Sequence, residues 1–356
     1  MMLGSIFAAG HSNNSLFQEA DPTHRFNPTY IFRFLREKFR KKGVEINTAD
    51  VNAKRQVDFE FHIEGRVLQP GQAPRFLVAL ENPFINPLNA DAEYFAGFRR
   101  VFTWNPRFAH LPNVREVGCS NHFVIPRWPG YEEREIFSCL INANKRFKTE
   151  PPNDLYLERI AVIRWYEQNA PRHFELYGLG WNKPRQESGV VGRMKRRAQR
   201  LATQLFGYRP FPSWEGEVAD KSSVLLRAKF AYCYENVYGL TGYVTEKIFD
   251  SLMNGCVPVY WGADDIGSRI PPDCFIDRRD FRDTAAVHAH LLSMSAKEYA
   301  RKQQAIREFL GSKSAEIYSS EYFVRTIVEE VTAEMEAAEM ATAETIAGNQ
   351  HSKSRT

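Results

Sequence analysis

Residues 230–262, FAYCYENVYGLTGYVTEKIFDSLMNGCVPVYWG, combine side chains that are suited to chemistry with a spacing that would bring them together. The aromatic and apolar run that ends at Tyr234 predicts a strand, which would deliver Glu235 and Asn236 to the carboxyl edge of a sheet. A loop with two glycines then leads into a helix that begins near Thr245. Because helix N-termini carry unpaired N–H groups, this segment is suited to binding an anion.

The first turn of this predicted helix carries both a cation and a carboxylate. Lys247 is a cation at a position where the helix dipole disfavours one unless an anion is nearby. Glu246 offers the carboxylate that binds a ribose diol in dinucleotide sites. Together they fit a nucleotide with a phosphate chain. The alternative, which the residues alone leave open, is that Thr245 and Glu246 only cap the helix and Lys247 is solvated.

The elements that must position these residues alternate between strands and helices. Apolar runs predict strands at Leu3–Ala9, Val44–Thr48, Phe59–Ile63, Phe76–Leu80, Val101–Trp104, Phe174–Tyr177, Phe230–Tyr234 and Val257–Trp261, and helical spacing predicts helices at Tyr30–Lys42, Ala90–Phe98, Leu155–Gln168 and Val244–Asn254. This alternation predicts an α/β fold with parallel sheets. The polar, proline-containing stretch Lys148–Asp154 predicts a domain boundary. We expect domains at residues 1–147 and 148–330, followed by a helical end and tail at 331–356.

Composition excludes several classes of protein. The 356 residues carry a formal net charge of only +4, which is too small to indicate a nucleic-acid partner. The five cysteines are scattered without paired spacing, so we expect neither disulfides nor a zinc site, and a reduced, cytoplasmic setting. No apolar run approaches the roughly 20 residues of a membrane span. We interpret the apolar run near the N-terminus as a strand and not as a signal peptide.

The segment Tyr232–Lys247 closely resembles the donor-site signature of the bacterial-type α-1,3-fucosyltransferase family, which has an aromatic-rich strand, Glu-Asn, a short loop and Tyr-Val/Ile-Thr-Glu-Lys. Cys256–Gly262, CVPVYWG, is similar to the strand that follows in that family. The resemblance covers roughly residues 76–325. It implies a GT-B fold, in which two Rossmann-like domains face each other across a cleft, and a GDP-fucose donor bound mostly by the C-terminal domain. One departure is the six-residue loop Val237–Gly242, where familiar members usually have five residues.

The resemblance also implies roles for individual donor-site residues. Glu246 would bind the guanosine ribose and Lys247 the pyrophosphate, while Asn236 and Tyr243 would line the phosphate and fucose region. The other donor-binding residues that it implies are Glu235, Val244 and Thr245, and further candidates are Asn142, Lys145 and Tyr238.

An arginine in the helix after the domain junction is a second point of similarity. Arg159 precedes IAVIRWY and the strand Phe174–Gly178, FELYG, in the order that the family shows. By resemblance Arg159 would clamp the pyrophosphate, for which a guanidinium fork is well suited. Arg164 is the competing candidate, and a surface arginine on an amphipathic helix is the alternative reading.

A transferase needs a general base, because the acceptor hydroxyl loses its proton as it attacks the anomeric carbon. Ala79–Pro83, ALENP, is similar to the family's strand ending in Glu-Ser/Asn-Pro, and residues 102–104, FTW, to its Phe-Asn-Trp-Thr segment. We therefore choose Glu81 as the catalytic base. Asp91 and Glu93 are the nearest alternatives, and a helix cap or a structural ion pair is the alternative role of Glu81.

The implied reaction is inverting transfer of L-fucose from GDP-β-L-fucose to an acceptor glycan, as an α-1,3 linkage to N-acetylglucosamine in lipopolysaccharide, O-antigen or a similar surface glycan. The acceptor would be an oligosaccharide or a glycolipid. The sequence contains no DxD motif of the metal-chelating kind, so we expect no required cofactor and at most stimulation by a divalent cation.

A basic stretch at residues 193–209 has apolar residues at helical spacing. A basic amphipathic helix of this kind can lie on an anionic membrane, which predicts peripheral contact with the inner membrane. A solvated helix with a core-facing stripe is the alternative. Two other functions also stay open: a transferase for another nucleotide-deoxysugar, and a non-catalytic membrane or nucleic-acid adaptor that uses this basic helix.

Overall fold

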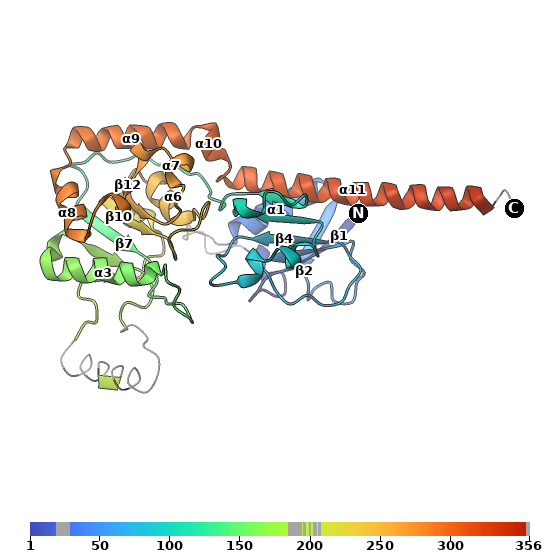
Figure 1. Ribbon diagram of the computed structural model, residues 1–356, viewed down its shortest axis with the longest axis horizontal. Helices are drawn as coiled ribbons and strands as arrows, with labels where there is room; N and C mark the ends of the chain where they lie inside the picture. The colour runs from blue at the N-terminus through green and yellow to red at the C-terminus, as the bar shows by residue number, and fades with distance from the viewer. Residues whose placement is uncertain are drawn as a thin grey trace. The chain divides into compact units, whose positions relative to one another are not determined.

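The computed structural model describes residues 1–18, 29–183 and 208–353, with isolated positions between 194 and 205. The chain forms two compact units (Figure 1). Unit 1 consists of Met1–Asp21, Asn27–His122 and Ile317–Thr356, and unit 2 of Pro22–Phe26 and Phe123–Glu316. These ranges place a boundary at His122/Phe123 and group the last helix with unit 1, whereas the sequence predicted a boundary at 147/148 and a separate end and tail at 331–356.

Unit 1 is built on a six-stranded sheet with the strand order β2-β1-β3-β4-β5-β6. Its strands are β1 (Met2–Phe7), β2 (Val44–Thr48), β3 (Phe59–Ile63), β4 (Arg75–Ala79), β5 (Arg100–Thr103) and β6 (Val114–Glu116). Every pairing is parallel. The predicted α/β class is therefore confirmed, and the N-terminal apolar run is the strand β1.

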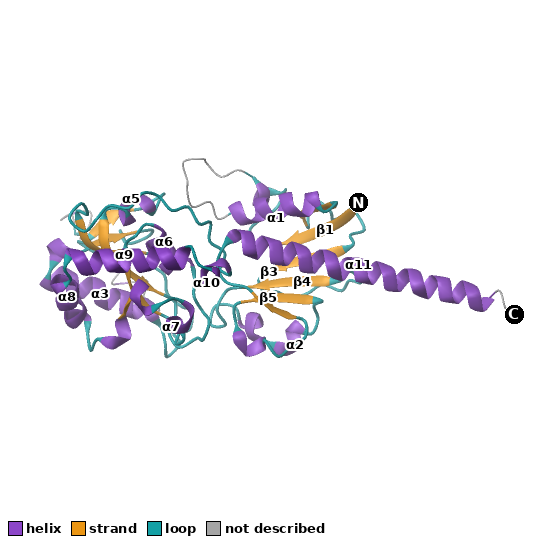
Figure 2. Cartoon of the chain, turned by 90° about the horizontal axis from the view of Figure 1, so that it is seen from above, coloured by secondary structure: helices purple, strands orange, loops and turns teal. Residues whose placement is uncertain are grey.

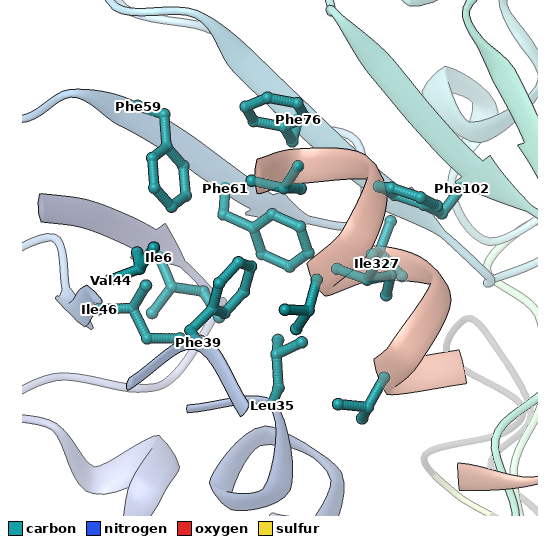
Figure 3. Close-up of a cluster of buried hydrophobic side chains, with 14 of the residues drawn as sticks. Ile6, Leu35, Phe39, Val44, Ile46, Phe59, Phe61, Phe76, Phe102 and Ile327 are labelled. Atoms are coloured by element: carbon teal, nitrogen blue, oxygen red, sulfur yellow. The ribbon is translucent and has the colours of Figure 1, made fainter. Parts of the chain in front are cut away.

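Helices cover both faces of this sheet. On one face lie α1 (Tyr30–Lys41) and α11 (Ser320–Lys353), and α2 (Ala92–Phe95) packs on the other (Figure 2). Phe39 of α1 and Ile327 of α11 lie among the phenylalanines of the strands (Figure 3). Because successive side chains of a strand point to opposite faces, a strand buried on both faces is apolar throughout.

Unit 2 has a second six-stranded parallel sheet with the order β12-β11-β10-β7-β8-β9. Its strands are β7 (Ile136–Ile141), β8 (Glu175–Tyr177), β9 (Trp214–Gly216), β10 (Ala228–Tyr234), β11 (Val257–Trp261) and β12 (Ile276–Asp277). Its helices are α3 (Leu155–Asn169), α5 (Ser222–Leu225), α6 (Glu246–Met253), α7 (Ile266–Arg269), α8 (Thr284–Ser293), α9 (Ala296–Leu310) and α10 (Lys313–Glu316). Short 3₁₀ turns in the two units lie at Ser15–Phe17, Pro87–Ala90, Pro106–Phe108, Pro171–His173, Pro272–Cys274 and Arg278–Asp280.

The strand order of unit 2 reverses between β7 and β10. The chain runs outward from β7 through β8 to β9, and then returns to the other side of β7 as β10. Open parallel sheets bind ligands beyond the carboxyl ends of their strands at such a switch point. The residues that follow β10, the predicted donor segment, start at this edge.

All five cysteines are free, and none of the described helices is long and apolar enough to cross a membrane.

We expect α11 to be an integral part of the core of unit 1. Ile327 has no exposed surface, whereas Met340 on the same helix is 63% exposed. Replacing Ile327 by alanine leaves a cavity and should lower the free energy of unfolding of unit 1 by about 2–5 kcal/mol. Met340→Ala is the matched control and should change it by less than about 0.5 kcal/mol. Urea denaturation followed by fluorescence measures both, and equal effects would show that α11 does not pack as described.

Candidate functional site

Glu235 follows β10 directly, is fully buried, and organises the start of α6. One carboxylate oxygen accepts the backbone N–H of Thr245 at 2.8 Å, and the other accepts its hydroxyl at 2.7 Å. The ammonium of Lys247 lies 3.2 Å from the same second oxygen. Thr245 is the N-cap residue of α6 but makes no capping bond with its own side chain. Glu235 therefore fixes the N-cap residue and the Lys247 ammonium in place through buried contacts.

Lys247 and Glu246 differ in how far they reach the surface. The side chain of Lys247 is 14% exposed and donates to the Thr245 hydroxyl at 2.8 Å. Burial alone would lower the pKa of Lys247, but Glu235 and Glu246 outweigh it and raise the pKa. The side chain of Glu246 is 46% exposed. Desolvation opposes its ionisation, yet Lys247 and Lys221 lower the pKa of Glu246 to about 2. Glu246 is thus an ionised, accessible hydrogen-bond acceptor beside a fixed cation.

A second ion pair lies beside Glu246 and was missed by reasoning from the sequence. Lys221 approaches Asp250 of α6 at 2.5 Å. Burial raises the pKa of Asp250 to about 6, although Lys221 opposes that shift. Asp250 is one helical turn after Glu246, and that spacing is visible in the sequence. Lys221 is separated from Asp250 by 29 residues, so no local pattern links it to the site.

Arg159 of α3 fixes the carboxyl end of β10. It is 2% exposed, and its Nη2 donates to the carbonyls of residues 234 and 235 at 2.6 and 2.7 Å and to Asn236 Oδ1 at 3.3 Å. It is therefore not the surface arginine of the alternative reading. Arg164 points elsewhere, to Glu167 at 2.6 Å. The structure thus brings Arg159, and not Arg164, to the predicted donor segment, while its contact with a pyrophosphate stays a prediction.

The six-residue loop Val237–Gly242 is held on both sides. Gly239 and Gly242 have φ values of 79° and 84°, which glycine adopts without strain. Tyr238 is 39% exposed and stacks on Trp261, with ring centroids 5.6 Å apart. Backbone groups of the loop bond to Asn153, Gly262 and Asp265. The longer loop is therefore an ordered part of the site that presents one face of Tyr238.

A cavity of about 580 Å³ lies beside this loop, beyond β11 and β12. Asp265, which accepts the N–H of Gly242 at 2.8 Å, lines it together with Arg279 and His290. This volume is within the range of small-ligand pockets. Among the described residues, no group of three or more His, Cys, Asp or Glu side chains could hold a metal ion.

The remaining donor-side candidates lie near the same sheet edge. Tyr243 and Val244 are each 2% exposed, and Asn236 Nδ2 lies 3.4 Å from the Tyr243 hydroxyl. Asn142 follows β7, the neighbour of β10, and Lys145 is exposed. Their roles in binding a donor stay predictions.

Glu81 belongs to unit 1 and follows β4 at the carboxyl edge of that sheet. Its Oε1 accepts the backbone and side-chain N–H groups of Asn82 at 3.0 and 2.9 Å. Asp91 caps α2 by accepting the N–H of Glu93 at 2.9 Å. Trp104 donates to the Leu80 carbonyl at 2.8 Å, which joins the two N-terminal segments of the resemblance.

Most of the predicted basic helix at 193–209 lies outside the described residues. Three of its apolar side chains are described, and they are exposed: Met194 by 68%, Leu201 by 55% and Leu205 by 64%. These three do not form the core-facing stripe of the alternative reading.

Comparison with known proteins identifies the C-terminal part of the chain. The family model "Glycosyltransferase family 10 (fucosyltransferase) C-term" matches residues 183–311. The chain is 38% identical over 66 residues to the alpha-(1,3)-fucosyltransferase FucT of Helicobacter pylori, and 36% identical over 63 residues to an alpha-(1,4)-fucosyltransferase of Arabidopsis thaliana. Each stretch is 18% of this chain, and the two stretches span only 14% and 16% of those relatives.

Solved structures resemble the chain over nearly its whole length. A crystal structure of an alpha1,3-fucosyltransferase is similar with a TM-score of 0.52 and 14% identity, covering 94% of this chain and 89% of that one. The sucrose-phosphate synthase of Thermosynechococcus elongatus is similar with a TM-score of 0.57 and 9% identity, covering 95% and 100%. At such low identity these likenesses show the fold alone, and they confirm the predicted GT-B class. The family match is to the C-terminal fucosyltransferase model of glycosyltransferase family 10, and it identifies residues 183–311 of this chain.

Proposed function

We propose that the protein is an inverting fucosyltransferase that moves L-fucose from GDP-β-L-fucose to a hydroxyl of an acceptor glycan. One observation carries this proposal: the start of α6, where the buried Glu235 holds Lys247 beside the ionised, accessible Glu246. In this proposal the Glu246 carboxylate accepts hydrogen bonds from the ribose hydroxyls, and Lys247 binds the diphosphate. The family match includes this segment.

In the proposed transfer step, Glu81 is the general base. Glu81 of unit 1 takes the proton of the acceptor hydroxyl as its oxygen forms a bond to the anomeric carbon of fucose. The bond from that carbon to the β-phosphate breaks at the same time, and GDP leaves with the bonding electrons. Because the new bond forms on the opposite face, the β-linked donor gives an α-linked product.

Fixed cations on the donor side would stabilise the leaving diphosphate. Lys247 is already held by Glu235 and Thr245, so little reorganisation is needed when negative charge develops. Arg159 and Lys221 add positive charge to the same region. We therefore propose that a divalent cation is not required and at most stimulates turnover.

The acceptor would be an oligosaccharide or glycolipid, such as N-acetylglucosamine in a lipopolysaccharide or other surface glycan. Two exposed apolar side chains follow Glu81 closely: Phe84 is 44% and Ile85 46% exposed. The Asn82 side chain accepts the N–H of Phe84 at 3.1 Å, which fixes this turn relative to Glu81. An aromatic ring so placed can stack on the C–H face of an acceptor sugar.

Calorimetry with GDP, UDP and dTDP tests the donor assignment. We expect GDP to bind and the other two to bind far more weakly. Glu246→Ala should weaken GDP binding about 10–100-fold, because it removes a charged hydrogen-bond acceptor. The exposed Glu132 serves as the control position, and Glu132→Ala should leave the GDP affinity unchanged. Failure of GDP to bind would contradict the proposal, and preference for dTDP or UDP would favour another nucleotide-deoxysugar.

Steady-state kinetics test the general base. Glu81→Ala should lower kcat for transfer about 100–10,000-fold, because no group then accepts the acceptor proton, while GDP binding stays normal. The exposed Glu93 is the matched control, and Glu93→Ala should retain the wild-type kcat. Near-normal turnover of Glu81→Ala would show that the base lies elsewhere.

The apolar turn can be tested by separating the two KM values. Phe84→Ala should raise KM for the acceptor about 2–10-fold through loss of ring stacking and leave KM for GDP-fucose unchanged. Phe84→Tyr keeps the ring and should restore the acceptor KM. Equal acceptor KM values for the alanine variant and the wild type would exclude Phe84 from the acceptor site.

A further inference from the structure

Glu64 occupies an unusual backbone position beside the candidate base. It follows β3 directly, and β3 pairs in parallel with β4, which ends just before Leu80 and Glu81. The N–H of Glu64 still donates to the Val78 carbonyl at 2.8 Å, so the sheet ladder reaches this residue. Its φ is 64°, in the left-handed region that few residues other than glycine adopt. Such backbone outliers cluster at functional sites, which directs attention to its side chain.

The carboxylate of Glu64 accepts backbone N–H groups just beyond the end of β3. Its Oε1 accepts the backbone N–H groups of Leu80 at 3.3 Å and Glu81 at 3.2 Å, and its Oε2 lies 3.1 Å from the same Glu81 nitrogen. Because successive N–H groups of a strand point to opposite sides, a longer β3 could accept only one of these two. The Glu64 side chain accepts both and so fixes the backbone from which the Glu81 carboxylate projects.

Asn89 forms hydrogen bonds with both Glu64 and Glu81. It is 3% exposed, and its Nδ2 donates both to Glu64 Oε2 and to the Glu81 carbonyl, the latter at 3.0 Å. Its Oδ1 accepts the N–H of Gly65 at 2.8 Å. Burial raises the pKa of Glu64, and its hydrogen bonds oppose that shift. The hydrogen bonds of this partly buried carboxylate thus go to Leu80, Glu81 and Asn89.

We propose that Glu64 is a positioning residue for the general base Glu81. The inference rests on the proposed function, since it assigns Glu81 the proton of the acceptor hydroxyl. Glu64 acts through the backbone of Leu80 and Glu81, so that the Glu81 carboxylate keeps one orientation. Removing it leaves both N–H groups without their acceptor and allows the end of β4 to shift.

A double-mutant cycle tests this role. Glu64→Ala should lower kcat about 100-fold, the effect of a misplacement near 1 Å, with normal GDP affinity by calorimetry. In the Glu81→Ala background the same substitution should cause no further loss, because a positioning residue has no effect once the group it positions is gone. Glu64→Gln keeps one oxygen for the two N–H groups but loses the acceptor for Asn89 Nδ2, so kcat should recover only in part. Glu37→Ala on the exposed face of α1 is the control and should leave kcat unchanged.

Equal losses of kcat in both backgrounds, or a normal kcat in Glu64→Ala, would overturn the proposal. If the role of Glu64 were purely structural, Glu64→Ala would lower the melting temperature but would show a normal kcat in assays well below that temperature. If Glu64→Ala does not fold, Asn89→Ser replaces it in the double-mutant cycle. We then expect Asn89→Ser to lower kcat in the wild-type background and to cause no further loss in the Glu81→Ala background. Absence of fucose transfer by the wild-type enzyme would instead refute the proposed function and would be seen before any variant is made.

Discussion

The start of α6 depends on one buried carboxylate. Glu235 directly follows the central strand β10, has no exposed surface, and bonds to both the backbone and the hydroxyl of Thr245 and to the ammonium of Lys247. A buried carboxylate is costly unless it is paired and hydrogen-bonded, so this arrangement forces the strand end and the helix start into one geometry. This geometry in turn fixes the positions of the half-exposed Glu246 and the partly exposed Lys247.

A similar arrangement of a carboxylate and backbone N–H groups occurs in unit 1 with different residues. Glu64 and Glu81 follow neighbouring parallel strands, and the carboxylate of Glu64 accepts the backbone N–H groups where the ladder stops. In each unit the carboxylate of a residue that directly follows a strand accepts backbone N–H groups of another segment. The reactive candidates, Glu81 and Glu246, are the neighbours of these structural carboxylates and not the carboxylates themselves. This division explains how accessible acidic groups can have fixed positions.

Sequence patterns predicted the parallel α/β class, most strand positions, and the segment that carries Glu246 and Lys247. They succeeded because apolar runs and the strand–loop–helix order are local properties. They did not predict the ion pair of Lys221 with Asp250 or the contact of Glu64 with Glu81, because folding alone brings these residues together. The return of α11 to unit 1 was missed for the same reason: its apolar residues reveal a helix but not the sheet that they cover. Glu235 and Arg159 also form buried contacts within the protein that the spacing of residues in the sequence did not predict.

Product analysis tests the proposed fucosyltransferase activity most directly. The protein is incubated with GDP-fucose and an array of oligosaccharide acceptors, and the linkage of each product is read by NMR. We expect release of GDP together with an α-linked fucose on a glycan hydroxyl. A β-linked product would contradict inversion, and no transfer of fucose to any acceptor, by protein shown to be folded, would contradict the proposed fucosyltransferase activity.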